Sequence, residues 1–260
     1  MKTLSETQEA ALTAAHSAGA DMEAIRWVYS PLRICLLGAH VDHQGGDVLG
    51  TAIDRRILLA FSPTPDAQVA LCSRDYEGRV CFSADAPPAD LSPAWGRYAA
   101  GAAVALNRRR PLARGIQGGI AGEAPVGGLS SSAAVGVDYL LALEHGNALE
   151  VTPEENIELD RIIENEYIGL KNGILDQSMI LLSRKGALTA MNCRSGEYTH
   201  IPPGNDLPEF RLAVVHSGIE QALVSTGYNR RVAECQDAAR LLLEASGQPL
   251  RERPVLGDVS

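Results

Sequence analysis

The stretch that most constrains this chain is Gly122–Val137, which reads GEAPVGGLSSSAAVGV. Its glycines bring bare backbone close to a ligand, and the small and apolar residues after the serines are typical of a helix. The first N–H groups of a helix have no intrahelical partner and carry the positive end of its dipole. A glycine-rich loop that leads into a helix therefore predicts an anion site, with phosphate as the expected ligand.

This loop differs from the common P-loop, which needs a lysine directly after its last glycine. No lysine lies between Gly115 and Ala148. The alternative is an ordinary turn followed by a helix that one serine caps. Both interpretations stay open on this stretch alone, so the other motifs of the chain have to decide between them.

Composition limits the class of protein. At 260 residues, 45% of them hydrophobic, the chain is long enough to bury a large core. Its 23 basic and 32 acidic residues argue against non-specific binding of nucleic acid. The five cysteines are odd in number and far apart, which favours free thiols in a reducing compartment. The first thirty residues lack a long apolar run, so we expect a cytoplasmic protein with no membrane partner.

Hydrophobic periodicity predicts an α+β fold, because a run of strands precedes most of the helices. The expected strands are Arg33–Gly38, Val48–Ile53, Arg56–Ser62, Val69–Arg74, Arg79–Ser83, Gly115–Ile120, Lys185–Asn192 and Phe210–His216. The expected helices are two short ones within Leu4–Val28, then Trp95–Asn107, one from the glycine-rich loop to about His145, and Arg230–Ala245. Ser30–Leu32 is expected to be a turn, Ile201–Gly204 a loop, and Gly247–Ser260 a linker.

A second polar stretch follows the first expected strand, with Arg33 inside the strand and His40, Asp42 and His43 just after it. Three interpretations are open. The stretch is a polar hairpin loop, a metal site that uses both histidines, or a sugar cradle in which a carboxylate accepts from vicinal hydroxyls and an arginine fixes a charged group. We favour the sugar cradle.

Two further acids lie close to helix ends. Thr152-Pro153-Glu154-Glu155 is a capping box, which predicts a helix from Pro153 to about Tyr167 with Glu164 in its last turns. The next helix opens near Gly173 and runs to about Leu182, so Asp176 lies in a first turn. The helix dipole favours the ionised form of an acid there, although a plain helix-terminal acid is the simpler interpretation.

Three stretches together resemble the galactokinase branch of the GHMP kinases. They are Arg33–Gly46 (RICLLGAHVDHQGG), Pro125–Ala133 (PVGGLSSSA) and Glu164–Gln177 (ENEYIGLKNGILDQ). Val224–Cys235 (VSTGYNRRVAEC) resembles a fourth stretch of that family. The resemblance runs in the family's order from about Ser30 to Leu243, and four matches in order are far more specific than one.

The resemblance implies that the glycine-rich loop wraps the phosphates of ATP. Its nucleotide-binding residues would be Pro125, Gly127, Gly128, Leu129, Ser130, Ser131 and Ser132. It also implies that the Ser132 hydroxyl and the Glu164 carboxylate hold Mg²⁺.

The resemblance further implies that Asp176 faces the anomeric hydroxyl of a sugar, with Arg33 beside it as the second catalytic residue. The substrate-binding residues would be Ala39, His40, Asp42, His43, Lys171, Gly173 and Tyr228. The expected partners are thus ATP and a small sugar or uronic acid.

One departure from the family pattern bears on the sugar. Galactokinases have Gly-Glu-His-x-Asp-Tyr, with the glutamate bonding the C6 hydroxyl, where this chain has Gly38-Ala39-His40-Val41-Asp42-His43. Losing that carboxylate removes an acceptor for a hydroxyl and also a repulsion against a C6 carboxylate. Lys171 stands where a proline is common and His43 replaces the tyrosine, so both add potential cations. The pattern resembles the branch that phosphorylates galacturonate at C1, and galactose is the alternative substrate.

The resemblance implies the GHMP kinase fold, with an N-terminal domain like domain 2 of ribosomal protein S5 and an incomplete ferredoxin-like C-terminal domain. We expect the first to cover residues 1–185 and the second residues 186–260. The family's third glycine-rich motif has no counterpart in Arg251–Ser260. On this pattern we expect a shortened chain, and a catalytically silent relative that binds sugar and ATP is a further alternative.

Overall fold

The structure is a computed structural model, and it describes residues 5–124, 128–208, 210, 212–215, 218 and 227–259. Its strands are β1 (Arg26–Leu37), β2 (Asp47–Pro63), β3 (Gln68–Ser73), β4 (Val80–Ser83), β5 (Ile116–Gly122), β6 (Leu188–Asn192) and β7 (Tyr198–Ile201). Its α-helices are α1 (Glu6–Ala18), α2 (Arg97–Asn107), α3 (Ser131–Asn147), α4 (Pro153–Ile162), α5 (Leu175–Leu182) and α6 (Tyr228–Ser246). Short helical segments are η1 (Asp42–Gln44), η2 (Ala94–Gly96), η5 (Leu256–Asp258) and the π-helical η3 (Ile163–Ile168).

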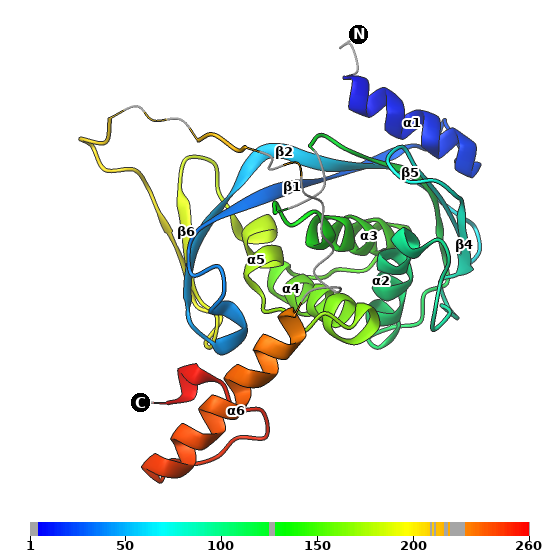
Figure 1. The fold of residues 1–260 in the computed structure, drawn as a ribbon. Helices are drawn as coiled ribbons and strands as arrows, with labels where there is room; N and C mark the ends of the chain where they lie inside the picture. Colours follow the sequence, from blue (N-terminus) through cyan, green and yellow to red (C-terminus); the bar gives the residue numbers. More distant parts are fainter. Residues whose placement is uncertain are drawn as a thin grey trace.

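The strands form one seven-stranded sheet around the long strand β2. The order is β4-β3-β5-β2-β6-β7, and β1 pairs antiparallel with the other edge of β2. The C-terminal part of β2 pairs with β5, while its N-terminal part, residues 47–50, pairs with β6. In Figure 1 the β1–β2 pair arches over the helices, so the loop that joins the two strands lies at one end of the arch.

The helices lie on both faces of the sheet. Helices α2 to α5 fill the concave face, and of the helices that the structure describes α1 lies on the opposite face (Figure 1). Helix α1 approaches β5 so closely that a Cβ on Gly119 would lie 2.2 Å from the Ala15 nitrogen, which explains the glycine there. The concave face therefore holds the main core, and the covering layer is thin.

The main core forms because α3 is apolar around almost its whole circumference. Tyr139, Leu140 and Leu143 of α3 are at most 1% exposed, and they pack with Phe61 of β2 and Leu106 of α2. A second cluster around Met179 of α5 joins that helix to β2 and β6. The two clusters fix α3 and α5 against the same strand, so the N-termini of both helices lie near β1.

The α+β class and most helix positions are confirmed, but the first strands differ from prediction. Of the two short helices expected within Leu4–Val28, only α1 forms in the described residues 5–28; the second is absent, because residues 21–25 are a turn and residues 26–28 belong to β1. The predicted turn Ser30–Leu32 lies inside the same strand. Pro31 is accommodated where the register shifts, between Pro31 and Arg33. Likewise β2 runs through Asp54 and Arg55, where two strands were expected. Asp54 and Arg55 lie where the pairing of β2 with β1 shifts register, between the Arg33–Ala52 and Pro31–Arg56 pairs, and the strand continues across this irregular step.

The C-terminal predictions are partly wrong. Strand β7 was missed because it is a short edge strand with little burial. Residues 210 and 212–215 of the predicted strand Phe210–His216 have no regular structure and are exposed, while Arg211 and His216 lie outside the described residues. The expected linker after Gly247 is docked instead. Leu256 donates its N–H to Gln44 Oε1 at 3.1 Å, and the described end of the chain thus contacts the β1–β2 loop.

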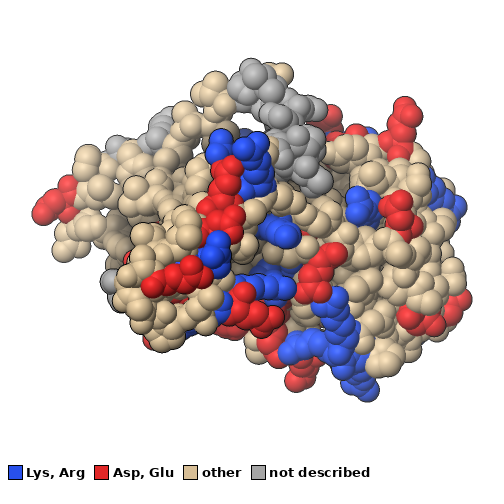
Figure 2. Space-filling view, turned by 60° about the horizontal axis from the view of Figure 1, so that its bottom comes forward, with Lys and Arg blue, Asp and Glu red and all other residues tan. Residues whose placement is uncertain are grey.

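Three broader expectations concern the division into domains, membrane association and surface charge. The division at residue 185 stays a prediction; strands β6 and β7, which follow it, belong to the same sheet as β2. Among the described residues, no helix is long and apolar enough to span a membrane. On the face seen in Figure 2, acidic and basic side chains lie side by side and form no continuous basic surface in the part drawn as described.

Candidate active site

Arg33 of β1 and Asp176 of α5 form the centre of the candidate site. The Arg33 Nε and a terminal nitrogen lie 2.8 and 2.6 Å from Asp176 Oδ1. The two side chains are only 15% and 19% exposed, so solvent screens this ion pair weakly. The pair fixes the first turn of α5 against the edge of β1.

Arg33 also contacts the glycine-rich loop. Its backbone N–H donates to the Leu129 carbonyl at 3.3 Å, and its guanidinium donates to the Gly128 carbonyl at 3.4 Å. Gly128 has a φ of 70°, a conformation that glycine adopts easily. The loop residues Pro125 and Gly127 lie outside the described residues. Within the described part, one arginine therefore joins the loop to Asp176.

The start of α3 separates the two interpretations of the serines. Ser130 precedes the helix with a φ of 59°, and its side chain makes no capping hydrogen bond. Its hydroxyl is buried without a partner, while Ser131 and Ser132 are the first helical residues. The simple serine cap is therefore wrong. A non-glycine residue held in the left-handed region costs about 1–3 kcal/mol and is characteristic of functional sites.

Glu164 lies at the start of η3 with its side chain inside the protein. The residue is 1% exposed; its Oε2 accepts from the Asn172 amide, and its Oε1 has no partner. The pKa of the Glu164 carboxyl is raised to about 7, chiefly by burial and also by the charge of Asp176, although hydrogen bonding from Asn172 and Ser132 and the charge of Arg33 act to lower it. These effects connect Glu164 with the Arg33–Asp176 pair.

The residues at this point fit Mg²⁺. The ion is commonly bound by one or two carboxylates together with substrate phosphates, and it retains several waters. Glu164 Oε1 is a buried oxygen without a donor, and the Ser132 hydroxyl is close enough to lower the Glu164 pKa. A cation would give that oxygen the partner it lacks.

The loop between β1 and β2 carries the expected sugar residues. Ala39 and His40 are exposed, whereas Asp42 is half-buried and its Oδ2 accepts from the Leu175 N–H at 3.2 Å. Burial raises the pKa of Asp42. A Cβ on Gly173 would lie 2.3 Å from that same oxygen. Gly173 is therefore needed for the close approach of Asp42.

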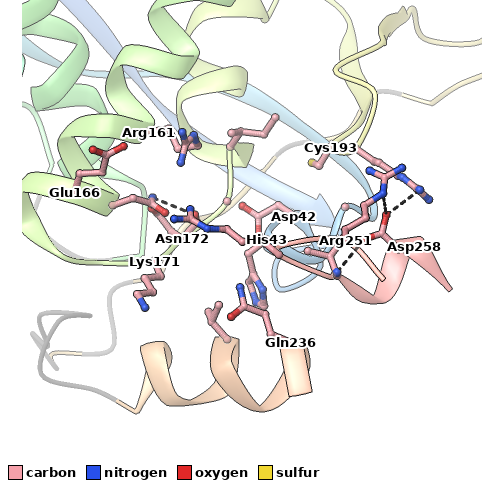
Figure 3. Close-up of a pocket in the computed structure, with 18 residues that line it drawn as sticks. Asp42, His43, Arg161, Glu166, Lys171, Asn172, Cys193, Gln236, Arg251 and Asp258 are labelled. Carbon is pink, nitrogen blue, oxygen red and sulfur yellow. Dashed lines mark hydrogen bonds and ion pairs between the residues drawn. The ribbon is translucent and has the colours of Figure 1, made fainter. Parts of the chain in front are cut away.

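A cavity of about 690 Å³ borders this loop. Figure 3 shows Lys171 and Asn172 on one wall, Arg251 and Asp258 on the other, and His43 between them. The rings of His43 and Tyr228 meet edge to face at 5.7 Å. Burial lowers the pKa of His43, which disfavours a positive charge on the ring. Lys171, the other expected cation, forms no ion pair with a described residue.

Tyr228 lies near the same acids. Its hydroxyl pKa is raised by burial and by the negative charges of Asp42, Asp176 and Glu164. The structure therefore brings together residues expected to bind the sugar from the β1–β2 loop, the Lys171–Gly173 segment and the start of α6. No group of three His, Cys, Asp or Glu side chains suited to a metal occurs among the described residues, so the histidine metal site in this loop has no support.

Sequence reasoning missed several asparagines and one acid. Asn165 donates to Asn172 Oδ1 at 2.8 Å, and Asn229 of α6 accepts from the Lys171 N–H at 2.9 Å. Asp160 is fully buried with neither carboxyl oxygen partnered, and burial together with Glu164 raises its pKa. No periodicity or spacing marks these residues. Their hydrogen bonds and their burial are apparent only in the folded structure.

Comparison with known proteins defines the class. The model of the GHMP kinases N terminal domain matches residues 97–184, and the galactokinase galactose-binding signature matches residues 16–63. A galactokinase of Thermococcus kodakarensis is 30% identical across 89% of this chain and 67% of its own length. The chain belongs to the GHMP kinases, in the group that contains the galactokinases, which confirms the resemblance seen in the motifs.

Within that class, the galacturonokinase of Arabidopsis thaliana is 47% identical across 90% of this chain and 60% of its own length. The crystal structure of Lactococcus lactis galactokinase complexed with galactose matches with a TM-score of 0.82 and 27% identity, covering 92% of this chain and 61% of that one. The chain thus spans about 60% of the length of these two relatives.

Proposed function

We propose that this chain carries the site of an ATP-dependent sugar-1-kinase, which transfers the γ-phosphoryl group of ATP to the anomeric hydroxyl of D-galacturonate. The products are ADP and the sugar 1-phosphate. The 47% identity to a galacturonokinase supports this choice of sugar. The family signatures within residues 16–63 and 97–184 support the reaction class.

The observation that carries the proposal is the double contact of Arg33. The same residue pairs with Asp176 at 2.6 Å and donates its backbone N–H to Leu129 at 3.3 Å. A nucleotide held by the Gly127–Ser132 loop and a sugar held beside Asp176 would therefore face one another across a single arginine. Phosphoryl transfer depends mainly on such positioning, because its transition state is loose.

One bond forms and one bond breaks in the proposed step. The anomeric oxygen bonds to the γ-phosphorus, the bond from that phosphorus to the β–γ bridging oxygen breaks, and ADP leaves. The hydroxyl proton passes to the Asp176 carboxylate late in the step, when the oxygen has lost electron density to phosphorus. Arg33 and the amides at the start of α3 neutralise charge that develops on the phosphoryl oxygens.

Ser132 and Glu164 would hold Mg²⁺ in this scheme. When bound, the ion neutralises charge on the phosphates and fixes their orientation. Glu164 is suited to the task because one of its oxygens is anchored by Asn172 and the other is bare.

Specificity for a uronic acid follows from the charges near the sugar loop. Ala39 offers no carboxylate that would repel a C6 carboxylate, and Lys171 supplies a cation that no described acid neutralises. His40, Asp42, Gly173 and Tyr228 would bind the sugar hydroxyls. The identity to galactokinases makes galactose the second candidate substrate.

The test is ADP release by the purified chain with ATP, Mg²⁺ and either sugar. We expect kcat/KM for galacturonate to exceed that for galactose at least tenfold, and Asp176→Asn to abolish turnover. A preference for galactose with galacturonate inert would overturn the substrate assignment. Binding of both ligands without any turnover would overturn the kinase assignment.

Ala39→Glu provides an independent check of the sugar. A carboxylate at this position would repel galacturonate and offer an acceptor to the C6 hydroxyl of galactose, so the ratio of the two kcat/KM values should shift toward galactose. The matched control is Ala39→Gln, which has the same shape without the charge and should shift the ratio less.

A further inference from the structure

We propose that Asn172, held by Asn165, is a positioning residue that orients the Glu164 carboxylate toward the metal site. The inference rests on the proposed function, because it gives Glu164 the role of a Mg²⁺ ligand. It adds two residues that lie inside the Glu164–Gln177 motif but were given no role there, and it predicts how they act. Neither asparagine is expected to touch the metal.

Each asparagine donates through its side-chain amide nitrogen, so the hydrogen bonds lead from Asn165 to Asn172 and from Asn172 to Glu164. The Asn165 amide nitrogen donates to Asn172 Oδ1 at 2.8 Å and to the Asn172 carbonyl at 3.2 Å. Because Asn172 Oδ1 is occupied as an acceptor, the amide nitrogen of Asn172 faces Glu164 and donates to Oε2. Asn165 thus fixes which end of Asn172 meets the carboxylate.

The consequence for Glu164 is that its two oxygens become different. Oε2 is tied to Asn172, while Oε1 is buried and has no partner within the described structure. A carboxylate anchored on one side keeps a single rotamer, so its bare oxygen stays aimed at one place. Partners of this kind, which hold a metal ligand without touching the metal, commonly change metal affinity by about 10- to 100-fold.

The backbone is folded to make this contact. The π-helical η3 ends at Ile168. The N–H of Gly169, which follows it, donates to the Glu164 carbonyl, and the Leu170 N–H donates to the same carbonyl at 2.8 Å. The chain then returns so that residue 172 meets residue 164. Asn229 of α6 holds the turn from outside by donating to the Gly169 carbonyl at 2.8 Å.

The test measures metal binding apart from turnover. Mn²⁺, which replaces Mg²⁺ and is visible by electron paramagnetic resonance, is titrated into the chain with a non-hydrolysable ATP analogue. We expect Asn172→Leu to raise the Mn²⁺ dissociation constant about tenfold. Asn165→Leu keeps the Asn172 amide that donates to Glu164 but removes the hydrogen bond that holds Asn172. It should raise the Mn²⁺ dissociation constant by a smaller factor.

Asn156→Leu is the matched control, because Asn156 donates to the buried Glu144 in the same way at 3.3 Å. It should leave the Mn²⁺ dissociation constant unchanged. Calorimetry without nucleotide should show galacturonate binding within twofold of the parent in Asn165→Leu, whereas collapse of the neighbouring loop would weaken it.

The outcomes separate the inference from the function on which it rests. If the parent binds Mn²⁺ with the nucleotide and both site variants bind it equally well, Asn172 is only structural and the inference is wrong. If the parent binds no Mn²⁺ with the nucleotide, the proposed function fails and the inference fails with it. If Asn172→Leu does not fold, Asn165→Leu decides, since it removes the support of the same amide.

Discussion

Two buried glutamates of this protein have the same immediate partner and different surroundings. Glu144 on α3 accepts from the Asn156 amide, and Glu164 on η3 accepts from the Asn172 amide. In each, Oε1 is buried without a partner. Burial, the largest cause in both, raises the pKa of each carboxyl to about 7.

The two glutamates differ in what holds the asparagine that donates to each of them. Asn172 is itself held by Asn165, whereas the Oδ1 atom of Asn156 is buried without a partner. The charges of Asp176 and Arg33 act on Glu164, while those of Arg109 and Glu155 act on Glu144. A strongly shifted pKa therefore does not distinguish a candidate site from a structural position in this molecule. We propose that the hydrogen bond from Asn165 to Asn172, which Asn156 lacks, is what distinguishes them.

The sharpest way to test this comparison is to remove the charge from each glutamate in turn. Glu164→Gln should lower kcat for ADP release at least 100-fold, or about 3 kcal/mol in the activation free energy, because the proposed metal site loses its charge. Glu144→Gln should leave kcat within twofold of the parent. Equal effects in the steady-state assay would show that the two glutamates do not differ in function.

Replacing Asn156, the hydrogen-bond partner of Glu144, should lower the free energy of unfolding. Asn156→Leu leaves the Glu144 carboxylate without its donor, so the free energy of unfolding should fall by about 1–3 kcal/mol. Urea denaturation followed by circular dichroism measures the loss. The double variant Glu144→Leu with Asn156→Leu should regain most of it, since both polar partners are then absent; no recovery would contradict this explanation.

The pH dependence of stability provides a third test. The folded pKa of Glu144, about 7, lies above its ordinary value of 4.5, so the folded protein binds more protons between these values. Stability from this group is therefore complete below pH 4.5 and is lost as the pH rises through 7. Glu144→Gln removes that loss.

Compared with the parent, Glu144→Gln should be about 1–2 kcal/mol more stable at pH 8 and nearly equal at pH 4.5. Urea unfolding at the two pH values measures the difference. A variant that gains the same stability at both would show that the Glu144 carboxyl titrates as it does in the unfolded chain.

The smallest effect is expected from an exposed acid on the same helix as Asn156. Glu158 of α4 pairs with Arg161, and its side chain is 55% exposed. Glu158→Gln should change the free energy of unfolding by less than about 0.5 kcal/mol, and added salt should reduce the change. A larger loss in urea denaturation would mean that exposed charge pairs, and not burial alone, stabilise α4.

Local signals predicted the helices well because the relevant chemistry is local. The capping box at Thr152 forms as expected, with Thr152 accepting from the Glu155 N–H and Glu155 accepting from the Thr152 N–H. Helix α3 ends at Asn147, close to the predicted His145. Strands were predicted less well. The predicted break near Asp54 coincides with a register shift in the pairing of β2 with β1, and the strand continues across it. Which strands pair depends on segments distant in the sequence, so local patterns do not predict it.

The site shows the same division. Arg33, Glu164 and Asp176 could be named from motifs, since a family pattern retains residue types at fixed spacing. Asn165 and Asn172 could not be given a role, because an amide is common on protein surfaces and its partner is chosen by the fold. The lowered pKa of His43 could not be predicted either, since it follows from burial.

By itself, the sequence determined the kinase family, the α+β class, the helix ends and the identities of the acids and the arginine in the candidate site. Only the tertiary structure decided that Arg33 meets Asp176 across 143 positions of the chain and contacts Leu129 as well. It also decided which oxygen of Glu164 is left bare. The physical reason is range: caps and periodicity depend on neighbours within a few residues, whereas burial, ion pairs and amide orientation depend on segments that packing brings together.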